Sequence, residues 1–225
     1  MTAADGVRHS KAADAELISD PELRAVREAS NAILQAERVR QYALEAIDQG
    51  RGFKLRPSKI LDLNRCAISG LDAYAGVWRP GTVEIEKSGH SPPGAHLVPE
   101  FVEELCDYIN DNWESCTPVH LSSMVMWRLN WIHPFTDGNG RTSRATAYLV
   151  LCAKSGSWLP GSDANTITDQ ILKSRGLYYA ALEAADAAYD ADRALRRGTV
   201  AKMEELIAAM LAAQLTGYFK AASGE

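Results

Sequence analysis

The segment from Gly140 to Lys154 (GRTSRATAYLVLCAK) constrains the fold more than any other part of the sequence. Its apolar residues do not keep to one face of a helix, and Gly156 just beyond it is a common helix-ending residue. A helix that is apolar nearly all round must be covered by other elements. We therefore expect a central helix, with apolar positions at Ala145, Ala147, Leu149, Val150 and Leu151.

Capping residues and apolar spacing indicate further helices. Asp20-Pro21 and Thr117-Pro118 each place a capping side chain before a proline at the first helical position. The first of these helices is expected to be amphipathic and to run to Gly50, with apolar positions at Leu23, Val26, Ile33, Val39 and Leu44. Other helices are expected at about residues 57–69, 100–113, 117–132, 166–173, 176–189 and 199–219.

The stretch from Gly76 to Pro99 differs in composition from the expected helices, because it is rich in glycine and proline. Its centre, residues 82–86, alternates polar and apolar side chains, which is typical of a strand. Residues 77–79, before Pro80-Gly81, are expected to form the second strand of a hairpin. The predicted fold class is therefore all-α, a helical bundle with one small β-hairpin.

Composition places the chain among ordinary globular proteins. Of its 225 residues, 46% are hydrophobic and 24% charged, and the net charge of −5 argues against a general nucleic-acid binder. We expect a disordered tail at residues 1–19, a helix packing on the core at 20–50, and one domain at 51–225. No apolar run is long enough for a membrane span, and the four cysteines form no CxxC pair. A cytoplasmic location fits these features.

The loop between two expected helices carries the chemistry of this chain, in the stretch WIHPFTDGNGRTSR at residues 131–144. Gly138, Asn139 and Gly140 can adopt backbone angles that turn consecutive N–H groups toward one concavity. This concavity opens the next helix, where unpaired amides and the helix dipole favour an anion. Arg141 and Arg144 follow on nearly one face, which indicates a clamp for a di- or triphosphate.

Two further residues complete a site for phosphate chemistry. Asp137 would repel phosphates unless a cation lies between them, which indicates a bound Mg²⁺. His133 has the side chain best suited to take a proton from a hydroxyl near neutral pH. Each residue alone is more often structural, but their order within one loop predicts in-line attack of a hydroxyl on a phosphate.

The run HPFTDGNGRTSR, residues 133–144, resembles the signature of the Fic family, HPFx[DE]GNGRxxR. The resemblance implies transfer of AMP from ATP to a Ser, Thr or Tyr hydroxyl of a target protein, with release of pyrophosphate. By position it makes His133 the general base and Asp137 the Mg²⁺ ligand. Gly138, Asn139 and Gly140 would line the anion hole, and Arg141 and Arg144 would bind the outer phosphates.

The resemblance also implies a flap that binds a target segment as an added strand. By its place in the chain, this flap corresponds to Thr82, Val83, Glu84, Ile85 and Glu86. Within the family, the death-on-curing branch has lysine where this chain has Gly140 and transfers the γ-phosphate, so glycine favours AMP transfer. Transfer of UMP, phosphocholine or phosphate remains an alternative, as does a catalytically inert module that binds nucleotide or a partner.

Many proteins of this family carry an inhibitory helix with the pattern [ST]xxxE[GN]. Residues 30–35, SNAILQ, resemble this pattern, with Ser30 retained and Leu34 in place of the glutamate. Either the inhibitory role is lost, or a separate antitoxin-like protein supplies the glutamate. If the helix docks beside Arg144, Leu34→Glu is expected to lower activity.

Overall fold

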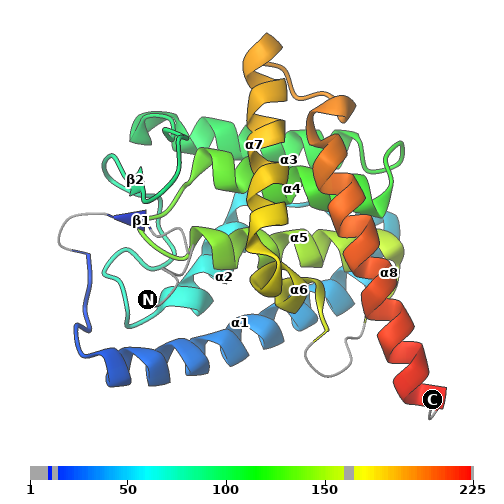
Figure 1. Ribbon diagram of the computed structural model, residues 1–225, viewed down its shortest axis with the longest axis horizontal. Helices are drawn as coiled ribbons and strands as arrows, with labels where there is room; N and C mark the ends of the chain where they lie inside the picture. Colours follow the sequence, from blue (N-terminus) through cyan, green and yellow to red (C-terminus); the bar gives the residue numbers. More distant parts are fainter. Residues whose placement is uncertain (1–9, 12–14, 160–164, 224–225) are drawn as a thin grey trace.

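The computed structural model describes residues 10–11, 15–159 and 165–223 of the chain. Within these ranges the fold is all-α apart from two short strands, as the sequence predicts (Figure 1). The strands are β1 (Ser10–Lys11) and β2 (Glu84–Ile85). The helices are α1 (Pro21–Gln49), α2 (Pro57–Ile68), α3 (Val98–Asp111), α4 (Pro118–Ile132), α5 (Asn139–Ser155), α6 (Ile167–Lys173), α7 (Arg175–Asp192) and α8 (Ala201–Ser223).

Helices α4 and α5 form the centre of the molecule. They pack on one another, α5 also contacts α1 and α2, and α4 contacts α3, α7 and α8 (Figure 1). Leu149, Val150 and Leu151 are completely buried, which confirms the expectation of a central, all-round apolar helix. Thr117 caps α4 by accepting a hydrogen bond from the His120 N–H at 3.1 Å. Because α4 and α5 are consecutive, the loop between them is held at both ends by the core.

Helix α1 lies along one side of this centre and begins as predicted. The carboxylate of Asp20 accepts hydrogen bonds from the backbone N–H groups of Glu22 and Leu23, both at 2.9 Å. Of the expected apolar face only Val39 is buried; the rest of the prediction is wrong, because Leu23, Val26, Ile33 and Leu44 are exposed. The buried face is instead partly polar, consisting of Asn31, Gln35, Val39, Ala43 and Ala46.

Hydrogen bonds explain why two amides replace apolar residues on the buried face of α1. Asn31 donates to the carbonyl oxygens of Ala67 and Ser69, at 3.3 and 3.0 Å, and Gln35 donates to that of Leu63 at 3.0 Å. These carbonyls belong to α2 and its C-terminal cap. Hydrogen bonds from α1 therefore offset the cost of burying polar groups at this contact.

The predicted β-hairpin is wrong in its partner strand. β2 covers only residues 84–85 of the expected 82–86, and residues 77–79 form no strand. The N–H of Arg79 donates instead to the Pro134 carbonyl oxygen at 2.9 Å, so this stretch is bound to the loop after α4. β2 pairs antiparallel with β1, from the N-terminal segment that the sequence analysis expected to be disordered.

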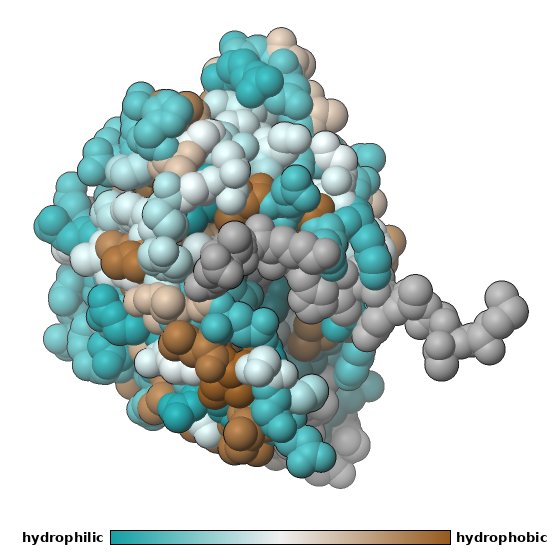
Figure 2. Space-filling view, turned by 90° about the vertical axis from the view of Figure 1, so that its left-hand side faces the viewer, coloured by the Kyte–Doolittle hydropathy of each residue, from teal (hydrophilic) through white to brown (hydrophobic). Residues whose placement is uncertain are grey.

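Apolar side chains also reach the surface. Figure 2 shows them gathered low on the face that carries the first turns of α1, where Leu17, Leu23 and Val26 are exposed. Among the described residues, no helix is both long and apolar enough to cross a membrane. The four cysteines are free thiols, and three of them, Cys106, Cys116 and Cys152, are buried.

Candidate active site

The loop after α4 begins with a histidine in an uncommon backbone conformation. His133 caps α4 with φ 51° and ψ 59°, in the left-handed region that few non-glycine residues adopt. Its N–H donates to the Leu129 carbonyl oxygen at 3.0 Å, and the residue is only 6% exposed. A non-glycine residue in this region costs free energy, so the surrounding structure has to hold it in place.

Arg79 provides much of that support. Its guanidinium is buried and donates from Nε to the His133 carbonyl oxygen at 2.8 Å and from Nη1 to the Gly81 carbonyl oxygen at 2.8 Å. A third hydrogen bond runs from Nη2 to the Pro93 carbonyl oxygen. Arg79 therefore joins the loop after α4 to the segment that contains β2. This role of Arg79 is not predictable from the sequence, because nothing near it in the chain marks it as a buried residue.

Two asparagines fix the rest of the loop. The Asn139 side chain accepts from the Phe135 N–H at 2.9 Å and donates to the Phe135 carbonyl oxygen at 2.8 Å. Asn64 of α2 donates to the Asp137 carbonyl oxygen at 3.1 Å and to Thr142 Oγ1 at 3.3 Å. The Asn139 side chain thus closes the loop, and only its backbone is left to serve the expected anion hole. Asn64 was also missed by the sequence analysis.

Gly138 sits where a side chain has no room. Its φ is 77°, and a Cβ built on it would lie 2.7 Å from Ile68 Cγ2 and 3.1 Å from Asn64 Nδ2. The absent side chain lets α2 lie directly against the loop at the start of α5. Gly138 is therefore required by both backbone conformation and packing.

We expect Gly138→Ala to destabilise the protein more than Gly156→Ala. Both glycines have positive φ, but a Cβ on Gly156 would meet nothing within 4 Å. Gly156→Ala should cost about 1–2 kcal/mol from backbone conformation alone, and Gly138→Ala about 1–3 kcal/mol more from overpacking. Urea unfolding of both variants measures the difference, and equal losses would contradict the close contact at Gly138.

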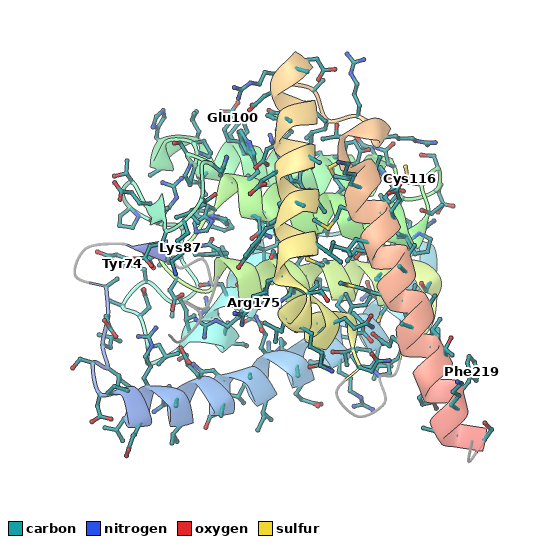
Figure 3. The ribbon with its side chains drawn as sticks, viewed as in Figure 1. Tyr74, Lys87, Glu100, Cys116, Arg175 and Phe219 are labelled. Atoms are coloured by element: carbon teal, nitrogen blue, oxygen red, sulfur yellow. The ribbon has the colours of Figure 1, made fainter. Side chains whose placement is uncertain are left out.

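A cavity of about 580 Å³ lies at this loop. One wall includes Arg175 at the start of α7, which is labelled in Figure 3. Other walls come from the start of α1 and from the first turn of α5. All seven residues of the motif expected to carry the chemistry line it: His133, Asp137, Gly138, Asn139, Gly140, Arg141 and Arg144. A cavity of this size suits a nucleotide-sized ligand.

Arg144 lines the cavity with a partly buried side chain, of which the Nε atom is fully buried. Its Nε has no hydrogen-bond partner among the described residues. Burial lowers the pKa of the guanidinium from its usual value, and the charge of Arg141 lowers it further. A Cβ on Gly140 would lie 3.1 Å from Arg144 Nη1, so the glycine leaves space for this side chain. A buried donor without a partner, beside the first turn of α5, favours an anionic ligand.

Four charged side chains form a closed ring at the cavity. The Asp137 carboxylate lies 2.9 Å from Arg141 Nη2 and 3.4 Å from Arg24 Nη2. Glu28 closes the ring, because its Oε1 lies 3.3 Å from Arg24 Nε and 3.8 Å from Arg141 Nη1. Positive and negative groups alternate around it. Both Asp137 and Arg141, the expected metal and phosphate ligands, are therefore already paired with residues of α1.

The structure does not bring the expected inhibitory position to the cavity. Leu34 is 58% exposed and lies outside the cavity lining, and the Ser30 hydroxyl donates to the Val26 carbonyl oxygen at 3.0 Å within α1. Residues of α1 that do reach the cavity are Arg24 and Glu28. The condition under which Leu34→Glu is expected to lower activity, docking of this position beside Arg144, is therefore not met, because α1 presents an earlier turn to the site.

Residues 82–86, expected to form the flap, surround β2 but only partly reach the cavity. Val83 is buried, Thr82 and Glu84 are exposed, and Glu86 follows the strand. Ile85 alone among them lines the cavity. One wall of the cavity is therefore formed in part by this strand.

His133 holds its imidazole neutral. Burial lowers its pKa to about 3, and the nearby Arg79 also lowers it. The depressed pKa leaves the ring unprotonated at any pH well above 3, with a nitrogen lone pair available, and makes it a weaker base in the free protein than an ordinary histidine. Nδ1 lies 3.4 Å from the Asn130 carbonyl oxygen, which favours the proton on Nδ1 and the acceptor role for Nε2.

We expect the imidazole of His133 to stay neutral when the pH of the free protein is lowered from 8 to 5. An unperturbed histidine would titrate near pH 6.5, but the pKa of about 3 places this transition far below that range. Nitrogen NMR of labelled histidines measures it, with His133→Ala to assign the signal. Protonation of His133 near pH 6.5 would show that the ring is not buried in solution.

Comparison with known proteins places this loop and its helices in a recognised class. Residues 54–151 match the model of the Fic/DOC family, a range that begins before α2 and ends within α5. These residues therefore form a Fic/DOC family domain, as the motif at 133–144 predicts.

Two relatives and two solved structures show the extent of the similarity. The "Protein adenylyltransferase Fic" of Drosophila willistoni is 36% identical over 94 residues, which are 41% of this chain and 18% of the relative. The "Protein adenylyltransferase fic-1" of Caenorhabditis elegans is 30% identical over 94 residues, with the same coverage of both chains. The match thus spans less than a fifth of each relative's length.

The solved structures extend the fold beyond the family model. A Fic domain containing signaling protein from Bacteroides thetaiotaomicron covers 92% of this chain and 76% of its own, with a TM-score of 0.73 and 22% identity. Fic-1 from C. elegans covers 92% of this chain and 55% of its own, with a TM-score of 0.63 and 22% identity. At this identity the similarity concerns the fold.

Proposed function

We propose that this protein is a protein adenylyltransferase, which transfers AMP from ATP to a Ser, Thr or Tyr hydroxyl of a target protein. The observation that carries this proposal is the shared cavity. A buried neutral histidine, His133, lines it together with the first turn of α5 and the guanidiniums of Arg141 and Arg144. The names of the relatives, which are adenylyltransferases, support the same reaction.

In the proposed reaction, the target hydroxyl oxygen bonds to the α-phosphorus of ATP. The bond from that phosphorus to the bridging oxygen breaks, and pyrophosphate leaves with that oxygen. His133 accepts the hydroxyl proton at Nε2, which its neutral state allows. Arg144 and the α5 amides face the phosphates, and the uncompensated Nε of Arg144 gains a hydrogen-bond partner.

Asp137 fits a role as the protein ligand of Mg²⁺. Its carboxylate lines the cavity, and no group of three or more potential metal ligands occurs among the described residues. A protein cage is therefore not available there, but Mg²⁺ commonly binds one or two carboxylates together with substrate phosphates and water. When bound, the ion would offset the negative charge of the phosphates. Its binding requires that Asp137 release Arg24 or Arg141.

The remaining walls of the cavity are assigned to the adenine of ATP and to the target protein. Tyr179 lines the cavity from α7, and we assign it to the adenine, which its aromatic ring would contact. β2 is assigned to the target, because an edge strand beside a cavity can bind an extended segment by backbone hydrogen bonds.

Intact-mass spectrometry of the purified chain with a candidate target, Mg²⁺ and ATP tests the proposed function. We expect the mass of one AMP to be added to a protein hydroxyl and pyrophosphate to appear in equal amount. A gain of phosphate alone would assign the chain to γ-phosphate transfer. Parallel reactions with UTP and with CDP-choline test transfer of UMP and of phosphocholine. Nucleotide binding without any transfer would support a catalytically inert binding module.

We expect Glu28→Gln to raise the affinity for ATP modestly. The substitution removes a carboxylate that competes with phosphate for Arg141, at a separation of 3.8 Å. Because both side chains are partly exposed, the gain should be at most about fivefold. Calorimetric titration measures it.

Glu37→Gln is the matched control for Glu28→Gln. Glu37 lies on the same helix, but its side chain is exposed and pairs only at 3.8 Å with Arg40 among the described residues. We expect no change in affinity from this variant. An equal effect of both substitutions would show that general charge, and not the pairing with Arg141, is responsible.

A further inference from the structure

A series of hydrogen bonds joins α4, α5 and α7 beside the cavity. Asn130, in the last turn of α4, donates from Nδ2 to the Ser143 hydroxyl of α5 at 2.8 Å and to the Tyr178 hydroxyl of α7 at 3.0 Å. The Ser143 hydroxyl donates in turn to the Gly140 carbonyl oxygen at 3.1 Å. We call Asn130, Ser143 and Tyr178 the Asn130 network. It connects three helices that all contribute residues to the cavity lining.

The orientation of the Asn130 amide follows from its neighbours. Nδ2 also donates to the Met126 carbonyl oxygen, one turn back on α4, at 2.7 Å. A carbonyl oxygen can only accept, so the opposite orientation of the amide would bring two acceptors into contact. Nδ2 therefore faces Met126, Ser143 and Tyr178, and the amide cannot turn away without losing hydrogen bonds to all three.

The two side-chain partners of Asn130 are buried. Ser143 is completely buried, and Tyr178 is only 3% exposed. Burial raises the pKa of the Tyr178 hydroxyl, and the nearby charge of Arg144 opposes that change. Water does not reach these hydroxyls, so a hydrogen bond lost from either one is not replaced by solvent. The Asn130 network therefore keeps its members in one arrangement.

On one side the Asn130 network supports the first turn of α5, which the proposed function assigns to the phosphates. Ser143 connects Asn130 to the Gly140 carbonyl oxygen, and it directly precedes Arg144 in the chain. Gly140 and Arg144 both line the cavity. The backbone carbonyl oxygen of Asn130 also lies 3.4 Å from His133 Nδ1. One residue of α4 thus contacts both the phosphate-binding turn and the proposed base.

On the other side the Asn130 network supports the wall of the cavity that is assigned to adenine. The rings of Tyr178 and Tyr179 are neighbours on α7, with centroids 5.8 Å apart, and both residues line the cavity. Among the described residues, α7 packs on α4, α6 and α8 and has little direct contact with α5. The spacing between the adenine wall and the phosphate-binding turn is therefore set through α4, where Asn130 contacts both helices.

We propose that Asn130 is a positioning residue, which sets the spacing between the phosphate-binding turn of α5 and the adenine wall of α7 so that both parts of one nucleotide bind together. This inference rests on the proposed function, which assigns the two walls. Without the Asn130 amide, each wall keeps its own groups, Arg144 and the α5 amides on one side and Tyr179 on the other. A ligand that spans both walls depends on their spacing, whereas a ligand that binds one wall does not.

Calorimetric titration of the full chain with three probes in the presence of Mg²⁺ tests this role. The probes are adenosine, tripolyphosphate and α,β-methylene-ATP, which spans both walls and cannot release pyrophosphate. We expect Asn130→Ala to bind α,β-methylene-ATP about tenfold more weakly, as for one lost hydrogen bond, and to bind adenosine and tripolyphosphate as the wild type does. Tyr178→Phe, which removes one hydroxyl of the network, should weaken only α,β-methylene-ATP, by about threefold. The double variant should lose no more than Asn130→Ala, because both changes break the same connection.

Asn110→Ala is the matched control. The Asn110 side chain also makes two hydrogen bonds, to the Leu55 N–H and carbonyl oxygen at 2.8 and 3.0 Å, but it does not line the cavity. We expect wild-type affinity for all three probes from this variant, although it loses stability.

Two results would overturn the inference while the wild type still binds α,β-methylene-ATP and transfers AMP. One is unchanged affinity for this analogue in Asn130→Ala, and the other is an equal loss for adenosine or tripolyphosphate alone. If Asn130→Ala does not fold, the same criteria apply to Tyr178→Phe. Failure of the wild type to bind the analogue would instead overturn the proposed function and the inference together.

Discussion

His133→Ala is expected to reduce AMP transfer by about 10²–10⁴-fold, the contribution typical of a positioned general base. The expectation rests on the imidazole, which is held neutral by burial and lines the cavity beside Arg141 and Arg144. Binding of ATP should change little, because the phosphate contacts come from other residues. Rates of pyrophosphate release and the dissociation constant for ATP measure the two effects separately.

His96→Ala is the matched control for His133→Ala. His96 is exposed, and it does not line the cavity. We expect wild-type rates from it. If His133→Ala lost transfer only in proportion to a loss of folded protein, measured by urea unfolding, the histidine would be a structural cap of α4 and the base would have to be sought elsewhere.

Asp137→Asn is expected to cause the second-largest loss, about 10²–10³-fold in transfer at fixed Mg²⁺, comparable to removal of one electrostatic stabiliser of a transition state. The amide keeps the size of the side chain but has no charge for the cation. Part of the loss should be recovered at higher Mg²⁺ concentration. Titration of Mn²⁺ with bound ADP, followed by electron paramagnetic resonance, provides a readout that does not depend on turnover.

Arg24→Gln separates the two roles of Asp137, as the proposed metal ligand and as a member of the charged ring. The substitution removes the 3.4 Å pair between Arg24 and the Asp137 carboxylate but keeps the negative charge of that carboxylate available to a metal. We expect this variant to bind Mn²⁺ at least as tightly as the wild type. A loss in Arg24→Gln as large as that in Asp137→Asn would show that the charged ring, and not the metal, requires the carboxylate.

The charged ring shows which residue of α1 presents a carboxylate to the arginines of the motif. The family pattern has a glutamate where this chain has Leu34, which indicates either a lost inhibitory role or a glutamate from another protein. The structure places Glu28 within 3.8 Å of Arg141, one to two turns earlier on the same helix. A carboxylate from α1 therefore reaches the site, but it faces the first arginine of the motif and not the second.

Residues close together in the sequence were sufficient to predict much of the fold. The first residues of α1 and α4 follow from Asp20-Pro21 and Thr117-Pro118, because an N-cap and the helix that it begins are neighbours in the chain. The central position of α5 follows from its all-round apolar pattern. The motif at 133–144 also predicted which residues line the cavity, because a loop between two helices brings its own side chains together.

The sequence by itself thus determined the helical class, the central position of α5 and the motif residues of the cavity. Only the tertiary structure decided what surrounds them: Arg79 under His133, Asn64 against Gly138, Arg24 and Glu28 around Asp137, and β1 on β2. The physical reason is separation along the chain. Capping and periodicity act between near neighbours, whereas buried hydrogen bonds, ion pairs and strand pairing join residues whose proximity arises only when the helices pack.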